Sequence, residues 1–222
     1  MKKNYKFIEK VDSIENETIY IKKCFTAMRM LAGNPNVVAN IADKDYSILE
    51  RNYILSMVYN MGKADLLREE TEFAFNSSSY IVGGETNKSV LVTDDKVEKT
   101  CRGLKVAINN NKIEVIPDLV IHDSHNPEAG NTGKGQYLIL EAKTTKRLGE
   151  YYFMRDFFKL NLYLAEFHFH NAVFLLIKKS AKTIDDYIDT YKKKDFYCSD
   201  ELKCKFRLFI QEKDTPEIFK LK

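Results

Sequence analysis

The chain has 222 residues, of which 44% are apolar and 30% charged, a balance typical of a soluble globular protein with room for one packed core. A formal net charge of +3 does not by itself indicate a nucleic-acid-binding protein, so a phosphate-binding surface would require local clusters of basic residues. No run approaches the ~18 consecutive apolar residues of a membrane span, and no apolar signal-peptide region follows the basic N-terminus. We therefore expect no membrane partner and a cytoplasmic location.

Two helices are predicted at the start of the chain. The first covers residues 12–32 and ends at Gly33-Asn34-Pro35, because proline cannot continue a helix. The second covers about 45–61, and its apolar stripe contains Ile54, Met57 and Met61. Glu50 falls on this stripe, where a carboxylate is costly unless a positive group lies opposite it.

The region from 71 to 121 is predicted to be rich in short strands. The candidates are residues 72–75, 80–82, 90–92, 105–108 and 112–121. The last two flank Asn109-Asn110-Asn111, and asparagine tolerates the left-handed backbone of a tight turn. We therefore expect these two strands to form a hairpin.

The C-terminal half is predicted to alternate strands and helices. After a loop at 123–135, the predicted elements are a strand at 137–144, a helix at 149–169, a strand at 172–177, a helix at 183–194 and a strand at 206–210. Flanking charges place the last strand near a sheet edge. The order predicts a mixed α/β domain with helices packed on a central sheet.

Three charged residues end two of these apolar strands. Asp118 follows Ile116-Pro117, and Glu141 and Lys143 follow the apolar run 137–140. Because residues two apart in a strand point to the same face, Glu141 and Lys143 project together. If the two strands are neighbours, Asp118 brings a second carboxylate beside them.

This combination suits hydrolysis of a phosphodiester. Mg²⁺ and Mn²⁺ prefer oxygen ligands, which the Asp118 and Glu141 carboxylates and the Ala142 carbonyl could supply. Such an ion activates water and polarises phosphate, while Lys143 could orient the water or neutralise charge in the transition state. The alternative is structural: Asp118 starts a turn, and Glu141 and Lys143 form an ion pair.

The pattern Pro117-Asp118 followed by Glu141-Ala142-Lys143 resembles the PD-(D/E)XK nuclease superfamily. The resemblance implies a restriction-endonuclease-like fold, a central mixed β-sheet flanked by helices. It also implies an acid on a helix before the sheet, a role that Glu50 fits and that Glu69, Glu70 or Glu72 could fill instead, and a helix after the E-x-K strand. It covers about 46–177, so residues 1–222 are expected to be a single nuclease-like domain with 1–44 as an N-terminal helical extension.

Some members of this superfamily carry Gln-x-x-x-Tyr on the helix after the E-x-K strand. This chain has Lys159 and Tyr163 at that spacing, which places both on one helix face, and a lysine can contact phosphate. Lys146, Arg147 and the loop residue Lys134 are further candidates for contacts with a nucleic-acid backbone. For each of these side chains, a solvated surface position is the alternative.

Together these features predict a metal-dependent nuclease that uses Mg²⁺ or Mn²⁺. The resemblance favours DNA over RNA, and an endonuclease of the restriction, defence or mobile-DNA type. A homodimer is compatible with this hypothesis, because cutting both strands of a duplex generally takes two active sites. The alternative is a catalytically inactive module of the same fold that binds nucleic acid or a partner protein.

Overall fold

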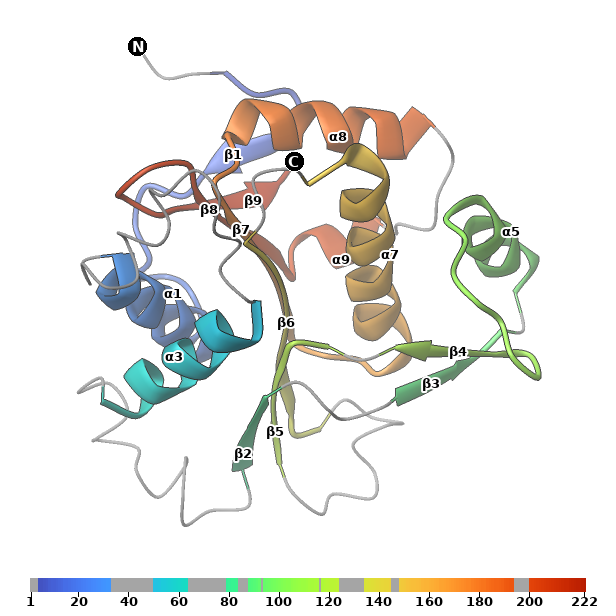
Figure 1. Ribbon diagram of the computed structural model, residues 1–222, viewed down its shortest axis with the longest axis horizontal. Coiled ribbons are helices and arrows are strands. Elements are labelled where there is room, and N and C mark those ends of the chain that lie inside the picture. Colours follow the sequence, from blue (N-terminus) through green and yellow to red (C-terminus); the bar gives the residue numbers. More distant parts are fainter. Residues whose placement is uncertain are drawn as a thin grey trace.

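The computed structural model describes residues 4–32, 50–63, 79–83, 88–92, 94–115, 117–123, 134–144, 148–193 and 200–222. Its centre is a seven-stranded sheet in the order β1-β9-β8-β7-β6-β5-β2 (Figure 1). The strands are β1 (Ile8–Lys10), β2 (Ser79–Gly83), β5 (Leu119–Asp123), β6 (Gln136–Lys143), β7 (Asn171–Ile177), β8 (Phe206–Gln211) and β9 (Glu217–Leu221). The expected mixed α/β architecture is thereby confirmed.

The middle of the sheet is parallel and its two sides are antiparallel. β6, β7 and β8 run in the same direction, whereas β5 and β2 on one side and β9 and β1 on the other are joined by antiparallel pairings. Parallel neighbours need a long crossover. Helices α7 (Glu150–Glu166) and α8 (Ala181–Lys193) lie in the two crossovers of this sheet centre.

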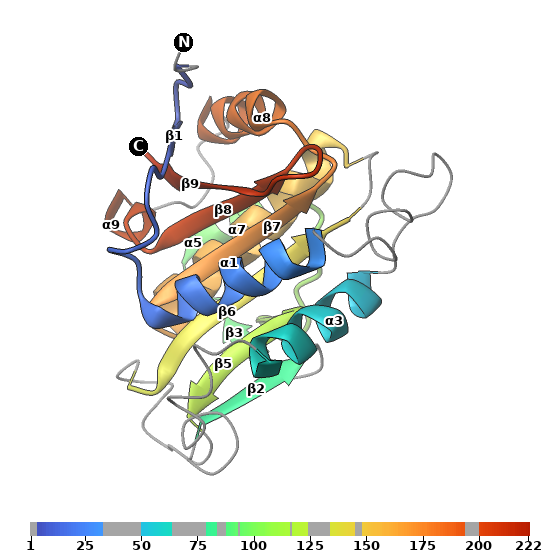
Figure 2. The ribbon, with the colours of Figure 1, turned by 90° about the vertical axis from the view of Figure 1, so that its left-hand side faces the viewer.

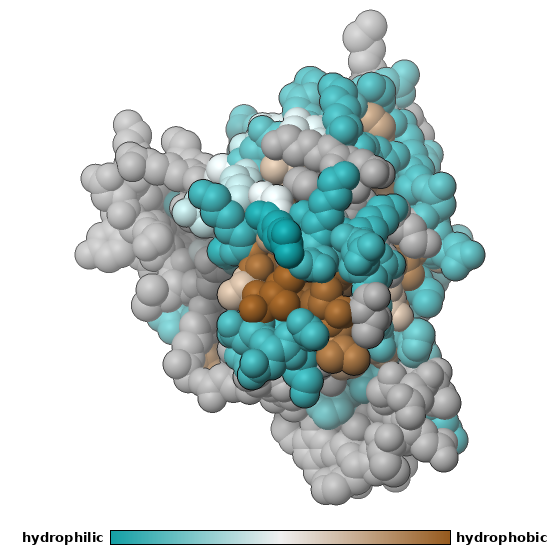
Figure 3. Space-filling view, turned by 90° about the vertical axis from the view of Figure 1, so that its right-hand side faces the viewer, coloured by the Kyte–Doolittle hydropathy of each residue, from teal (hydrophilic) through white to brown (hydrophobic). Residues whose placement is uncertain are grey.

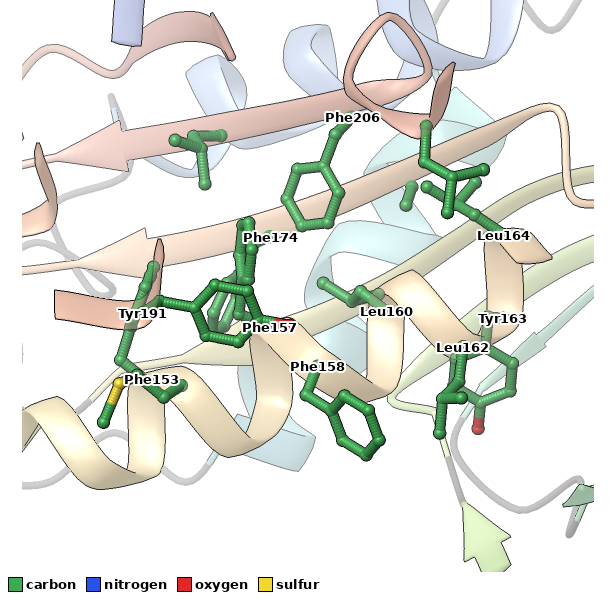
Figure 4. Close-up of a cluster of buried hydrophobic side chains, with 14 of the residues drawn as sticks. Phe153, Phe157, Phe158, Leu160, Leu162, Tyr163, Leu164, Phe174, Tyr191 and Phe206 are labelled. Atoms are coloured by element: carbon green, nitrogen blue, oxygen red, sulfur yellow. The ribbon is translucent and has the colours of Figure 1, made fainter. Parts of the chain in front are cut away.

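Helices cover both faces of the sheet. Figure 2 shows α1 (Ile19–Ala32) and α3 (Glu50–Lys63) across one face, and α7 lies on the other. Side chains of β6 alternate between the two cores: Leu138, Leu140 and Ala142 pack on the α1 and α3 side, and Ile139 packs on the α7 side. Aromatic residues from α7, α8, β7 and β8 fill the second core (Figure 4).

A smaller part of the fold differs from the predicted hairpin. β4 (Lys112–Val115) pairs with β3 (Lys88–Leu91) in a separate two-stranded sheet. The turn before β4 is confirmed, because Asn110 and Asn111 have φ of 51° and 57°. The predicted strand at 105–108 is wrong: this segment follows helix α5 (Asp95–Gly103), whose first turn is capped by Asp94.

The predicted strand at 112–121 is divided in two. β4 ends at Val115 and β5 begins at Leu119, with Pro117 and Asp118 between them. Proline has no N–H to donate to a strand ladder, so the pairing is interrupted at this position. The interruption leaves Asp118 directly before β5.

Other boundaries also differ. α1 begins at Ile19 instead of residue 12, because Thr18 accepts a hydrogen bond from the Ile21 N–H in the manner of an N-cap. β8 is not near the edge of the sheet, since β9 and β1 lie beyond it. Helix α9 (Asp200–Lys203) precedes β8. The predicted strand at 72–75 lies outside the described residues.

The terminal segments belong to the same sheet and cores. β1 comes from the expected extension at 1–44, and β8 and β9 come from beyond the expected catalytic core at 46–177. None of the helices within the described ranges has the length and apolar character of a membrane span. The molecular face that looks away from α1 and α3 carries an apolar patch bordered by hydrophilic side chains (Figure 3).

Candidate functional site

Asp118 and Glu141 lie next to each other across two antiparallel strands. Leu119 of β5 pairs with Leu140 of β6, which places the preceding Asp118 beside the following Glu141. The Asp118 N–H donates to the Leu140 carbonyl at 3.1 Å, and the Ala142 N–H donates to Asp118 Oδ2 at 2.7 Å. The site therefore lies at the carboxyl end of the parallel strand β6.

Glu141 is a carboxylate inside the protein, with only 3% of its surface exposed. Its Oε1 atom has no hydrogen-bond partner among the described residues. Burial raises the pKa of Glu141 well above its usual range, Asp118 and Asp156 raise it further, and Lys159 and Lys143 only partly oppose them. A buried acceptor of this kind favours either a proton or a cation beside it.

Lys143 lies between a backbone oxygen and a second acid. Its Nζ atom donates to the Ala142 carbonyl at 2.9 Å and lies 3.3 Å from Asp156 Oδ2. The Lys143 side chain is 16% exposed and therefore more accessible than Glu141 and Asp156.

Helix α7 contributes Asp156, Lys159 and Tyr163 to the same region. These residues are three and four positions apart and therefore share one helix face. Lys159 Nζ lies 3.0 Å from Asp156 Oδ1 and 3.9 Å from Glu141 Oε1. The structure thus brings Lys159 to the carboxylates, as the spacing predicted.

Tyr163 is fully buried at one end of the aromatic cluster (Figure 4). Its hydroxyl has no hydrogen-bond partner within the described ranges. Burial raises the pKa of Tyr163, and the charges of Glu141 and Asp118 raise it further. The Tyr163 hydroxyl is therefore within electrostatic reach of both carboxylates.

Asp156 was not expected at the site. It is 1% exposed, and although burial acts to raise its pKa, Lys159, Lys143 and Arg155 outweigh burial and lower it. The sequence signal was an acid three residues before Lys159 on a helix whose neighbouring positions are aromatic. Such an acid needs positive partners, as Glu50 does.

Of the remaining predicted residues, only Lys134 has a described side chain, and Lys134 is not brought to this site. α3 begins at Glu50 and packs on the opposite face of the sheet, and the Glu50 side chain lies outside the described part of the chain. Lys134 precedes β6, at the end of the strand away from Glu141. Lys146 and Arg147 lie outside the described residues.

The donor set at the site fits a hard cation held partly by backbone and water. Within the described ranges, no group of three or more His, Cys, Asp or Glu side chains is arranged to hold a metal ion. A divalent ion here would combine the Asp118 and Glu141 carboxylates with the Ala142 carbonyl and water molecules, as Mg²⁺ commonly does. The buried Glu141 Oε1, which accepts no hydrogen bond from a described residue, is compatible with such an ion.

Comparisons of the chain with protein-family models, with curated proteins and with solved structures find no match. The functional interpretation therefore rests on the residues and the geometry of the site.

Proposed function

We propose that this chain is a metal-dependent nuclease of the PD-(D/E)XK type, with a restriction-endonuclease-like version of the α/β fold. The observation that carries the proposal is that Asp118 lies beside Glu141 on the neighbouring strand, with Lys143 two residues further along β6. Glu141 is buried, and its Oε1 has no hydrogen-bond partner among the described residues. The antiparallel β5–β6 pair followed by a parallel crossover through α7 supports the fold assignment.

Asp118, Glu141 and the Ala142 carbonyl would hold Mg²⁺ or Mn²⁺. Such an ion, when bound, polarises the phosphate and lowers the pKa of a coordinated water. Asp118 is held beside Glu141 by the Ala142 N–H, which donates to its Oδ2 atom. The Ala142 carbonyl has a second lone pair in addition to the one that Lys143 uses.

Lys143 and Lys159 would contact the substrate from the solvent side of the carboxylates. Their side chains are 16% and 20% exposed, whereas Glu141 and Asp156 are almost completely buried. Ammonium groups at this position neutralise charge on a phosphate as it gains negative charge in the transition state. Tyr163 could add a hydrogen bond through its hydroxyl but is too buried to stack on a base.

The substrate proposed is DNA, cut internally by an endonuclease of the restriction, defence or mobile-DNA type. A specific observation favours the rival, a catalytically inactive module that binds nucleic acid or a partner protein: Asp156 pairs with both Lys143 and Lys159. This pairing gives both lysines a structural role without a substrate.

The test is cleavage of supercoiled circular DNA, linear duplex DNA and RNA in the presence of Mg²⁺ or Mn²⁺. Wild type should cut, and Glu141→Gln and Lys143→Ala should each lose the activity. Glu114→Gln and Lys99→Ala are matched controls, because both residues are exposed and lie outside the site. Opening of the circle shows endonuclease action, and absence of cutting on all three substrates favours the inactive module.

A further inference from the structure

Asp156 is the most enclosed charged group of the site. The three basic side chains around it are Lys159 at 3.0 Å, Lys143 at 3.3 Å and Arg155 at 3.6 Å. They come from two elements, β6 and α7, so that one carboxylate connects the strand that carries Glu141 to the helix packed over it.

Asp156 and Glu141 compete for the same ammonium group. Lys159 lies nearer to Asp156, at 3.0 Å, than to Glu141, at 3.9 Å. Since attraction between opposite charges weakens with distance, Asp156 holds Lys159 more strongly. Lys159 Nζ consequently stays at 3.9 Å from Glu141 Oε1, beyond hydrogen-bond distance.

We propose that Asp156 is a positioning residue that keeps Lys159 and Lys143 from closing onto Glu141, so that Glu141 remains available to a divalent cation. The inference depends on the proposed function, which supplies the cation. Asp156 itself does not bind the metal. Without the Asp156 charge, Glu141 becomes the nearest anion for Lys159. A Glu141–Lys159 ion pair then competes with the cation.

The inference predicts that Asp156→Asn weakens Mn²⁺ binding about 10- to 100-fold, the range usual for residues that act through a metal ligand. The double variant Asp156→Asn/Lys159→Gln should recover most of the lost affinity, because the competing ammonium group is gone. If Asp156 were itself a ligand, the double variant would bind as weakly as the single one.

The experiment is calorimetric titration of wild type and both variants with Mn²⁺, with crystal structures of the metal-free wild type and Asp156→Asn. Asp185→Asn is the matched control, because it neutralises another buried aspartate that accepts hydrogen bonds from the backbone of 6–8. It should lower stability and leave Mn²⁺ affinity unchanged. In Asp156→Asn, Lys159 Nζ should move from 3.9 Å to hydrogen-bond distance of Glu141.

The results separate this inference from the proposed function. Unchanged Mn²⁺ affinity in Asp156→Asn, or Lys159 remaining at its present distance from Glu141, overturns the role of Asp156 even if the wild type cuts DNA. Weakened binding with recovery in the double variant supports that role even if the wild type cuts no substrate. A wild type that binds no Mn²⁺ overturns both.

Discussion

Replacing Glu141 by glutamine should stabilise the metal-free protein at neutral pH. At 3.9 Å from Lys159, Glu141 gains about 4 kcal/mol of attraction at an effective dielectric constant of 20. Burying an ion costs several kcal/mol, and Asp118 and Asp156 repel Glu141 in addition. The raised pKa of Glu141 indicates that these costs exceed the attraction to Lys159. The nearer partner of Lys159 is Asp156, at 3.0 Å. We expect a gain on the order of a few kcal/mol in the free energy of unfolding, the part of the burial cost that the attraction does not offset.

The gain should depend on pH with a definite sign. Between the ordinary Glu pKa of 4.5 and the raised folded-state value, the folded protein binds more protons than the unfolded chain. The free energy of unfolding of the wild type therefore falls as pH rises through this window. Glutamine does not titrate, so the advantage of the variant is small below pH 4.5 and largest above the folded-state pKa.

Urea unfolding at pH 5 and pH 8 in the presence of a chelator measures this difference. Glu114→Gln is the control, because Glu114 is exposed and its replacement should change stability little. Mn²⁺ should raise the stability of the wild type more than that of Glu141→Gln, since a ligand stabilises the state that binds it. If Glu141→Gln is less stable than wild type at pH 8 without metal, the ionised Glu141 carboxylate stabilises the fold and the prediction is wrong.

Three further predictions concern the core, the N-terminal strand and the metal. Asp185→Ala should lower the free energy of unfolding in urea by about 2–4 kcal/mol, because the Asp185 carboxylate accepts the backbone N–H groups of residues 6–8 at 2.7–3.1 Å. Hydrogen exchange of these three amides should become faster, and an unchanged exchange rate would contradict the prediction. Phe174→Ala removes a fully buried ring and should lower the free energy of unfolding by about 3–5 kcal/mol. The control Tyr152→Ala should lower it by less than about 1 kcal/mol, because Tyr152 is 53% exposed. Mn²⁺ binding at a pH below the raised pKa of Glu141 should release protons, because this ligand must ionise to bind the metal. Titrations at pH 5 in two buffers of different ionisation enthalpy measure this release, and equal heats would count against it.

The elements around the site were predictable because their patterns are strong. β6 and β7 are continuous apolar runs of the kind buried on both faces, and α7 has an apolar stripe at helical spacing. The period of two in a strand correctly placed Glu141 and Lys143 on one face. Their position beside Asp118 needed the register of β5 on β6, which no local pattern determines.

Several features depend on contacts that sequence reasoning did not weigh. α5 was missed although Asp94 is a good N-cap and Val97 and Cys101 have helical spacing, because short apolar runs on either side favoured strands. β9 is short and partly charged, and it is a strand because β8 pairs with it. Asp156 had a sequence signal in its spacing to Lys159, but its contact with Lys143 of β6 depends on how α7 packs on the sheet.

The position of Lys134 follows from topology. Asp118 precedes β5 and Glu141 lies near the end of β6, so the two meet at one end of an antiparallel pair. The end of β5 and the start of β6 then lie at the other end of the pair, and Lys134 lies just before β6. Lys134 was expected to contact a nucleic-acid backbone, but the antiparallel pairing places it away from Asp118 and Glu141.

Asp118→Asn gives the sharpest test of the nuclease proposal, through the rate at which the protein opens supercoiled circular DNA in the presence of Mn²⁺. The amide oxygen of asparagine can still accept the Ala142 N–H, so the fold should be retained while a charged ligand is lost. The wild type should cut, and the rate in the variant should be at least about 100-fold lower, since metal ligation lowers the barrier by several kcal/mol. Equal rates in the two proteins, or no cutting by either, would contradict the proposal.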